Sequence, residues 1–296
     1  MTRKLTLDTL NAVAVGDFAS ALATVFEHSP WLAAAAARAR PFSSLASLRD
    51  AAIAAIDAAS PAQRLKLIRA HPDLANKTQR AAGLTAESTS EQDGAGLDRL
   101  SDAEFARFEQ FNKAYQAKFG FPFVLCVRRH TKDSILDVFE RRLRNEPLQE
   151  EKAAISEISR IATLRLAERF ADEMSPSVYG CLSTHVLDTH CGQPAAGVEL
   201  ELIELSRHGA SRLIVKTVTN RDGRTDDALI AGRPVPIGTY ELRFKTAAYY
   251  ARRGVALSNP PFLDVVPIRF GVAEPERHLH VPLLLTPWSY MTYRGS

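Results

Sequence analysis

Cysteine is scarce in this sequence of 296 residues, and its three copies, Cys126, Cys181 and Cys191, show no CxxC spacing. An odd number of cysteines without paired spacing predicts neither a disulfide framework nor a zinc cage, and it fits a reducing compartment. Long apolar runs are missing as well, because no stretch reaches the roughly 18 residues that a membrane-spanning helix needs. The beginning of the chain carries acidic side chains and lacks the apolar core of a secretory signal. We therefore expect a soluble, cytoplasmic protein.

A block of charge of one sign is also lacking. The 37 basic and 34 acidic side chains are scattered along the sequence and leave a formal net charge of +3. Proteins that follow a phosphate backbone usually concentrate lysine and arginine in a patch or a run. Nucleic acid is therefore not an expected partner.

Glycine and proline are sparse in the first part of the chain. The segment up to Met174 is rich in Ala, Leu, Arg and Glu, whereas ten of the 15 glycines and ten of the 16 prolines follow it. The length and the 46% apolar content allow two domains, each with its own core. We predict an all-α domain over residues 1–174 and an antiparallel β-sandwich over residues 175–296, with the seam between Glu173 and Gly180.

Three amphipathic stretches support a helical first domain. Ser101 and Glu104 form a capping-box pattern ahead of aromatic residues spaced three or four apart, and Gly120 ends that run. Thr131 can cap a second helix, and a third runs over about residues 149–170. These patterns predict helices that pack one apolar face on a common core.

Alternating apolar and polar residues in the second part indicate strands with one buried face. Leu200 and Leu202 alternate with glutamates, and Tyr240, Leu242 and Phe244 alternate with Glu and Arg. Turn signals separate such short segments at intervals of roughly ten residues. This spacing is typical of an antiparallel sandwich.

Polar residues at three places in the first part could carry chemistry. His71 precedes a proline after an amphipathic stretch, so it should lie at a helix end, where a catalytic and a half-buried structural histidine look alike. Ser88, Glu91 and Gln92 should share one side of a helix, although Ser88 and Glu91 also form a capping-box pattern. Arg165 continues an apolar stripe, so it should face inward and bind either an anion or a structural carboxylate.

These residues lie in longer motifs that resemble the decarboxylases of 2-oxo-4-hydroxy-4-carboxy-5-ureidoimidazoline (OHCU). The resemblance covers nearly all of the first 170 residues, in the family's order. Its motifs are Ala70-His-Pro-Asp-Leu-Ala75, Leu84-Thr-Ala-Glu-Ser-x-x-Glu-Gln92, Ala95-Gly-Leu97, Phe119-Gly-Phe-Pro-Phe-Val124 and Ile161-Ala-x-Leu-Arg-Leu166. It implies that His71 is the catalytic acid/base and Glu91 its orienting carboxylate. The implied substrate-binding residues are Pro72, Ser88, Gln92, Phe121, Phe123 and Arg165.

Polar residues also stand out in three segments of the second part. His185 lies with Ser183 on one face of an expected strand, and a turn presents Arg224. His278 and His280 point to the same side of a later strand. With His185 as a third ligand these two histidines could hold a metal ion, or each could be a structural residue.

This second set resembles the transthyretin-like 5-hydroxyisourate hydrolases, from about residue 180 to the end of the chain. The terminal Tyr293-Arg-Gly-Ser296 is its most specific motif. The resemblance implies that His185 and His280 activate water and that Arg224 binds the substrate and its developing oxyanion. Ser296 would complete the pocket. The implied substrate-binding residues of the terminal motif are Tyr293, Arg294 and Gly295.

Taken together, the two resemblances imply a bifunctional enzyme of urate breakdown without a cofactor or a metal. The second domain would hydrolyse 5-hydroxyisourate to OHCU, and the first would decarboxylate OHCU to (S)-allantoin. The expected partners are small purine-derived molecules and further copies of the chain, as a dimer of helical domains and a homotetramer of sandwiches, with no membrane. A carrier built on the sandwich and a metal-dependent amidohydrolase remain the two alternatives.

Overall fold

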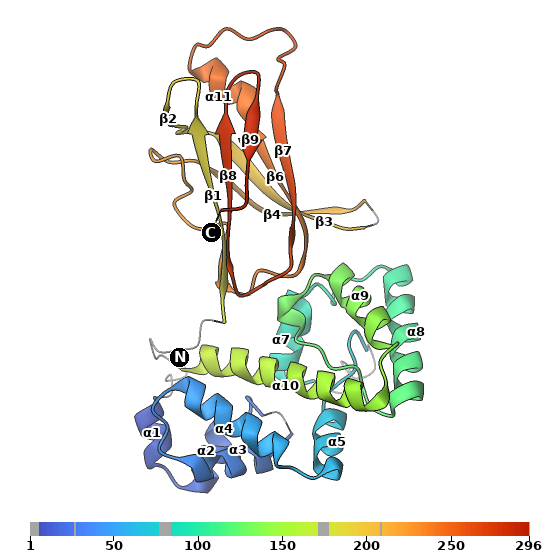
Figure 1. Ribbon diagram of the computed structural model, residues 1–296. Coiled ribbons are helices and arrows are strands. Elements are labelled where there is room, and N and C mark those ends of the chain that lie inside the picture. The colour runs from blue at the N-terminus through green and yellow to red at the C-terminus, as the bar shows by residue number, and fades with distance from the viewer. Residues whose placement is uncertain (1–5, 27, 77–83, 171–177, 208, 296) are drawn as a thin grey trace. The chain divides into compact units, whose positions relative to one another are not determined.

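The computed structural model describes residues 6–26, 28–76, 84–170, 178–207 and 209–295 (Figure 1). The chain divides into two compact units, Met1–Val178 and Tyr179–Ser296. The seam expected after residue 174 lies outside the described residues. Among the helices that the structure describes, none is long and apolar enough to cross a membrane.

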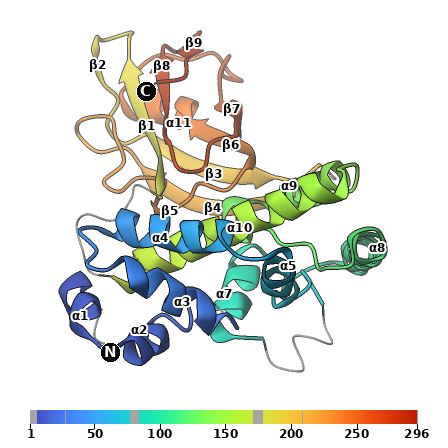
Figure 2. The same ribbon diagram turned by 60° about the horizontal axis from the view of Figure 1, so that its bottom comes forward.

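The first unit is all-α, as predicted. Its longest helix, α10, packs against α4 and α5 (Figure 1) and runs beside α7 (Figure 2). The helical elements are α1 (Leu7–Ala12), α2 (Val15–Ala21), α3 (Pro30–Ala36), η1 (Ala37–Ala39), α4 (Leu45–Asp57), α5 (Pro61–Arg69), α7 (Ala86–Gly94), α8 (Asp102–Phe119), η2 (Val127–Arg129), α9 (Lys132–Arg142) and α10 (Pro147–Arg169).

Local sequence signals set the ends of the later helices. Ser101 and Glu104 form the expected capping box at the start of α8, and Gly120 ends this helix with a left-handed φ of 73°. Thr131 caps α9, as predicted. The helix α10 begins at Pro147, two residues earlier than expected, because the first position of a helix does not need the N–H that proline lacks.

A buried carboxylate joins three of these helices. Glu150 of α10 is fully buried and accepts hydrogen bonds from the Tyr115 hydroxyl of α8 and from Nε of Arg142 in α9, the latter at 2.8 Å. Asn145 donates to its other oxygen at 2.7 Å. Arg142 also donates to the carbonyl of Val124 at 2.8 Å. The network thus fixes the chain segment that follows α8, as well as the helices.

Removal of this carboxylate should destabilise the helical unit. In Glu150→Ala the Arg142 guanidinium stays buried without a counter-charge, so we expect the free energy of unfolding to fall by about 3–5 kcal/mol. Denaturant unfolding followed by the far-ultraviolet signal of the helices measures it. The control Glu109→Ala removes an exposed ion pair with Lys113 and should cost about 0.5 kcal/mol or less. Equal stabilities of the two variants would contradict this account.

The second unit is a sandwich of two sheets, in agreement with the predicted class. One sheet has the strand order β2-β1-β8-β9, with β5 paired to β1, and the other has the order β4-β3-β6-β7. Apolar residues from both sheets form one shared core. The elements are β1 (Gly180–Asp188), β2 (Gln193–Pro194), β3 (Glu199–Leu205), β4 (Ser211–Val218), β5 (Ile230–Arg233), β6 (Gly238–Lys245), α11 (Thr246–Arg252), β7 (Val265–Val272), β8 (His278–Leu285) and β9 (Tyr290–Thr292).

Strand pairing in the sandwich is antiparallel except at one place. The strands β1 and β8 run parallel over their whole length, which the alternation of residues did not predict. In this register Ser183 lies opposite His280, and Cys181 lies opposite His278. Two strands that are far apart in the sequence therefore bring their polar residues to the same face of one sheet.

Candidate active sites

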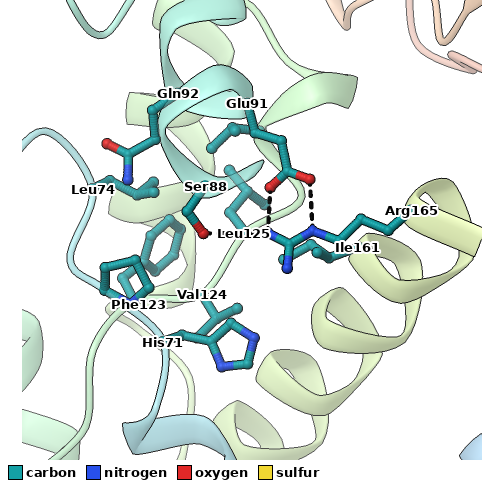
Figure 3. Close-up of a pocket in the computed structure, with 12 residues that line it drawn as sticks. His71, Leu74, Ser88, Glu91, Gln92, Phe123, Val124, Leu125, Ile161 and Arg165 are labelled. Atoms are coloured by element: carbon teal, nitrogen blue, oxygen red, sulfur yellow. Dashed lines mark hydrogen bonds and ion pairs between the residues drawn. The ribbon is translucent and has the colours of Figure 1, made fainter. Parts of the chain in front are cut away.

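A cavity opens in the helical unit between α7, α10 and the segments after α5 and α8 (Figure 3). It collects most of the residues that the sequence motifs singled out. Phe121 does not line it, because its ring packs against Tyr115 and Phe119. The lining residues are His71, Pro72, Leu74, Ser88, Glu91, Gln92, Phe123, Val124, Leu125, Val127, Ile161 and Arg165.

The helix α7 carries the polar wall of this cavity. Thr85 is its N-cap and accepts the backbone N–H of Ser88 at 3.2 Å. The alternative of a cap formed by Ser88 and Glu91 is therefore wrong, because both residues lie inside the helix, one turn further on. Their side chains are engaged with Arg165 instead.

Arg165 forms a buried ion pair with Glu91. Its Nε and Nη2 atoms donate to the two carboxylate oxygens at 2.8 Å each, and the two side chains are only 5% and 13% exposed (Figure 3). Nη2 also donates to Ser88 at 3.2 Å, and Nη1 donates to the carbonyl of Thr24 at 3.2 Å. The structural ion pair that was one expectation for Arg165 is thus formed. The carboxylate of Glu91 orients the guanidinium of Arg165, whereas the motif resemblance implied that it orients His71.

His71 lies just beyond the C-terminal end of α5 and lines the same cavity, as its position before a proline predicted. Its Nδ1 is 3.0 Å from the carbonyl oxygen of Leu67. Since a carbonyl can only accept, Nδ1 carries the proton in the neutral ring and Nε2 is the basic nitrogen. The imidazole is therefore held in the tautomer that a proton-transfer group needs.

Three carboxamides hold residues 73–75, the loop after His71. Gln92 accepts the N–H of Ala75 at 3.1 Å, Asn112 donates to a loop carbonyl at 2.8 Å, and Gln116 donates to a loop carboxylate at 2.7 Å. Ala75 has a left-handed φ of 57°, which a residue with a side chain rarely adopts without such support. The sequence motifs did not single out the residues from α8, because their spacing is that of an ordinary helix face.

A second polar cluster lies in the sandwich. A β-bridge pairs His185 of β1 with Arg224, and another pairs His280 of β8 with Gly295. The parallel pairing of β1 and β8 sets both histidines on adjacent strands. Four of the residues that the sequence pointed out therefore meet in one region.

Both imidazoles of this cluster favour the neutral form. Burial lowers the pKa of His185 first, and the nearby charge of Arg224 lowers it further. Burial also lowers the pKa of His280, followed by the effects of Arg224, His278 and His185. Nε2 of His185 is buried, and no hydrogen-bond partner is found for it among the described residues. A neutral imidazole has one nitrogen without a proton, and this nitrogen can accept one.

The end of the chain approaches His280 closely. Gly295 donates its N–H to the carbonyl of His280 at 2.9 Å, and a Cβ at this position would lie 2.7 Å from Cδ2 of the imidazole. Only glycine fits there without displacing the ring. Arg294 is held by Glu274 at 3.0 Å, and Tyr293 is exposed. Ser296, the last residue of the motif, lies outside the described residues.

His278 is connected to His280 through a serine. The Ser183 hydroxyl is 2.7 Å from Nε2 of His278 and 2.9 Å from Nδ1 of His280. Within the parts of the chain that the structure describes, no three His, Cys, Asp or Glu side chains are grouped to hold a metal ion. The metal alternative would need His185 to join this pair, and the structure does not bring the three together in that way.

These two units define a helical cavity lined by a histidine and a buried ion pair, joined in one chain to a transthyretin-type sandwich with a histidine and arginine cluster. Residues 11–167 match the family model of the OHCU decarboxylases, and residues 182–295 match that of the HIUase/transthyretin family. The chain belongs to the OHCU decarboxylase family through its first part and to the HIUase/transthyretin family through its second.

Individual relatives agree with this division. A 2-oxo-4-hydroxy-4-carboxy-5-ureidoimidazoline decarboxylase of Haloferax volcanii is 41% identical over 57% of this chain and 99% of its own length. A 5-hydroxyisourate hydrolase of Halalkalibacterium halodurans is 50% identical over 40% of this chain and 98% of its own length. The crystal structure of an (S)-allantoin synthase covers 99% of this chain and 100% of its own, with 35% identity and a TM-score of 0.53.

Substitution of Arg224 should change the titration of both buried imidazoles. In Arg224→Gln we expect the pKa of His185 and of His280 to rise toward 6.5, because a positive neighbour is removed. NMR titration of the ring protons measures this shift. The control Arg221→Gln changes an exposed arginine of the same turn and should leave both values unchanged.

The lowered pKa values of His185 and His280 also predict how the stability of the protein changes with pH. Because the pKa of each ring is lower in the folded protein than in the unfolded chain, the unfolded chain binds more protons below about pH 6.5. The free energy of unfolding should therefore fall as the pH decreases through this range, and it should fall less in Arg224→Gln. If the NMR titration midpoints of His185 and His280 are the same in Arg224→Gln as in the wild type, the electrostatic coupling is disproved.

Proposed function

We propose that the protein carries out two consecutive steps of urate breakdown at two separate sites. The sandwich hydrolyses 5-hydroxyisourate to OHCU, and the helical unit decarboxylates OHCU to (S)-allantoin and CO₂. The observation that carries this proposal is that each unit brings a histidine and an arginine to one site, within the matched residues of the corresponding family. The whole-length similarity to a solved (S)-allantoin synthase supports (S)-allantoin as the product.

Hydrolysis of the ring amide needs three groups, and the sandwich supplies them. A base must take a proton from water, a positive group must stabilise the tetrahedral oxyanion, and an acid must protonate the leaving nitrogen. His185 and His280 are neutral at physiological pH because burial and Arg224 lower their pKa values, so either ring can accept the proton of water. Arg224 is the oxyanion group, and Gly295 holds the terminal residues Tyr293 and Arg294 beside the site.

Decarboxylation needs little more than an anion site and a proton for one face of the substrate. Loss of CO₂ leaves an electron pair that the imidazolone ring accepts. His71 first takes up a proton from solvent at Nε2 and then gives it to carbon, which sets the S configuration. A lone guanidinium would bind the substrate carboxylate more tightly than it binds the transition state, because the negative charge of the carboxylate disperses as CO₂ leaves. Glu91 offsets the charge of Arg165, so recognition relies on directed N–H donors. Pro72, Ser88, Gln92 and Phe123 form the surrounding walls.

The carrier alternative is less well supported by the sandwich. A carrier needs an apolar channel without groups that transfer protons. This sandwich instead places a neutral imidazole with an unpartnered nitrogen next to Arg224. Hydrolysis accounts for this arrangement, whereas ligand carriage does not.

Removal of His71 should separate the two activities. In His71→Ala we expect decarboxylation to slow by about 10²–10⁴-fold, since the proton donor is lost, while hydrolysis of 5-hydroxyisourate continues at the wild-type rate. Circular dichroism records the formation of optically active allantoin, and ultraviolet absorbance follows the first step. The matched control His28→Ala changes an exposed histidine of the same unit and should alter neither rate. Unchanged decarboxylation with S product in His71→Ala would remove this assignment.

The proposed assembly is a homo-oligomer, with a tetramer of sandwiches and a dimer of helical units. Large apolar side chains remain exposed in and beside β9, which supports contact with another copy. They are Trp288, Tyr290, Met291 and Tyr293, between 45% and 62% exposed.

Light scattering should therefore give a mass four times the 32.5 kDa of one chain. Met291→Lys places a charge in the exposed apolar surface and should lower this mass. The control Val15→Lys, at an exposed apolar residue of the helical unit, should not. A wild-type mass of one chain would refute the assembly.

A further inference from the structure

Ser183 occupies a central position between two imidazoles. The rings of His278 and His280 are 6.1 Å apart between centroids, too far for a direct hydrogen bond. The Ser183 hydroxyl lies between them, 2.7 Å from Nε2 of the first ring and 2.9 Å from Nδ1 of the second. The parallel register of β1 and β8 sets this serine opposite His280, and the two-residue period of β8 sets both histidines on its side.

We infer that Ser183 and His278 form a proton relay behind His280, through which His280 passes on the proton that it takes from water. The inference rests on the proposed hydrolase function and deepens it. Ser183 and His278 act through His280 and are positioning residues, not groups that touch the substrate.

The hydroxyl group permits only two arrangements of protons, and these define the relay. A serine has one proton, so it donates to one ring and accepts from the other. In the resting arrangement Nδ1–H of His280 donates to Ser183, whose hydroxyl donates to Nε2 of His278. Nε2 of His280 is then the base.

The transfer balances in both directions. When Nε2 of His280 takes the proton of water, its Nδ1 proton moves to the Ser183 oxygen, and the hydroxyl proton moves to Nε2 of His278. The hydroxide attacks the amide carbon, and the positive charge now rests on His278. The reverse movement follows when Nε2 of His280 gives its proton to the leaving nitrogen. No proton is gained or lost over the cycle.

Electrostatics gives the reason for such a relay. A positive charge on His280 would lie near Arg224 and His185, in a half-buried place, and both effects lower the pKa of this ring. His278 is exposed to solvent, so a positive charge there is hydrated. Among the described residues, the charged and titratable side chains on the segments next to His280 include Cys181, His185, Asp188, Arg224, Glu274, His278, Tyr290 and Arg294.

A relay and a purely structural hydrogen bond can be distinguished by replacing His278 with a residue that keeps the hydrogen bond but cannot take up a proton. In His278→Gln the amide can still bond to the Ser183 hydroxyl, but it cannot take up a proton. The relay predicts that kcat for 5-hydroxyisourate falls about 10-fold to 100-fold, part of what proton transfer usually contributes, while KM changes by less than about 2-fold. Ser183→Ala should behave alike, and Ser183→Thr, which keeps a hydroxyl, should recover most of the rate.

The rate in mixtures of H₂O and D₂O gives an independent readout. A relay moves more than one proton in the rate-limiting step, so the wild-type rate should depend on the deuterium fraction along a curve. In His278→Gln and Ser183→Ala this dependence should become linear, because one proton then moves. Wild-type kcat and a curved dependence in His278→Gln would overturn the relay.

Three controls separate the possible failures. His190→Gln changes an exposed histidine in a turn of the same sandwich and should leave kcat unchanged. Two measurements on the same full chain show that each variant is folded. They are its decarboxylation of OHCU and its thermal unfolding. If His280→Ala hydrolyses 5-hydroxyisourate normally, the proposed hydrolase site itself is wrong. If His280→Ala is inactive and His278→Gln is not, only the relay is wrong.

Discussion

The ion pair between Glu91 and Arg165 determines the geometry of the helical unit's site. Its partners are 74 residues apart in the sequence, on α7 and α10, and both are almost fully buried. Separation of the two helices would leave a buried charge without a partner, which is strongly destabilising. The pair thus fixes the distance between two cavity walls. In the proposed decarboxylation, it also offsets the positive charge that would otherwise hold the substrate carboxylate in its ground state.

In the sandwich, the parallel register of β1 and β8 has the corresponding role. A shift by one residue would turn every side chain of β1 to the opposite face, so His185 and Ser183 would leave the site together. The fully buried Leu182 and Val186 alternate with them and oppose such a shift. The apolar core therefore holds the proposed catalytic face in position, so stability and the proposed activity depend on the same alternation.

The features that the sequence predicted are mainly local. The cap of α8, the αL glycine that ends it and the buried apolar face of β6 depend on residues within a few positions of each other, and the structure confirms them. Glu241, expected on the exposed face of β6, is buried as well and pairs with Arg243 and Arg269. The role of Ser88 could not be settled locally, because Thr85 caps the helix instead and Ser88 accepts a hydrogen bond from Arg165, 77 residues away. The relay of Ser183 was equally hidden, since it needs a parallel pairing between strands that lie about 100 residues apart.

A mixing experiment tests the central claim, that two separate sites act in sequence. Freshly generated 5-hydroxyisourate is given to His71→Ala, to His280→Ala and to an equimolar mixture of both, and circular dichroism follows the formation of allantoin. The account predicts that each variant alone forms (S)-allantoin no faster than the spontaneous reactions of its stalled intermediate allow, and that the mixture restores rapid formation. Rapid formation of (S)-allantoin by either variant alone would contradict it.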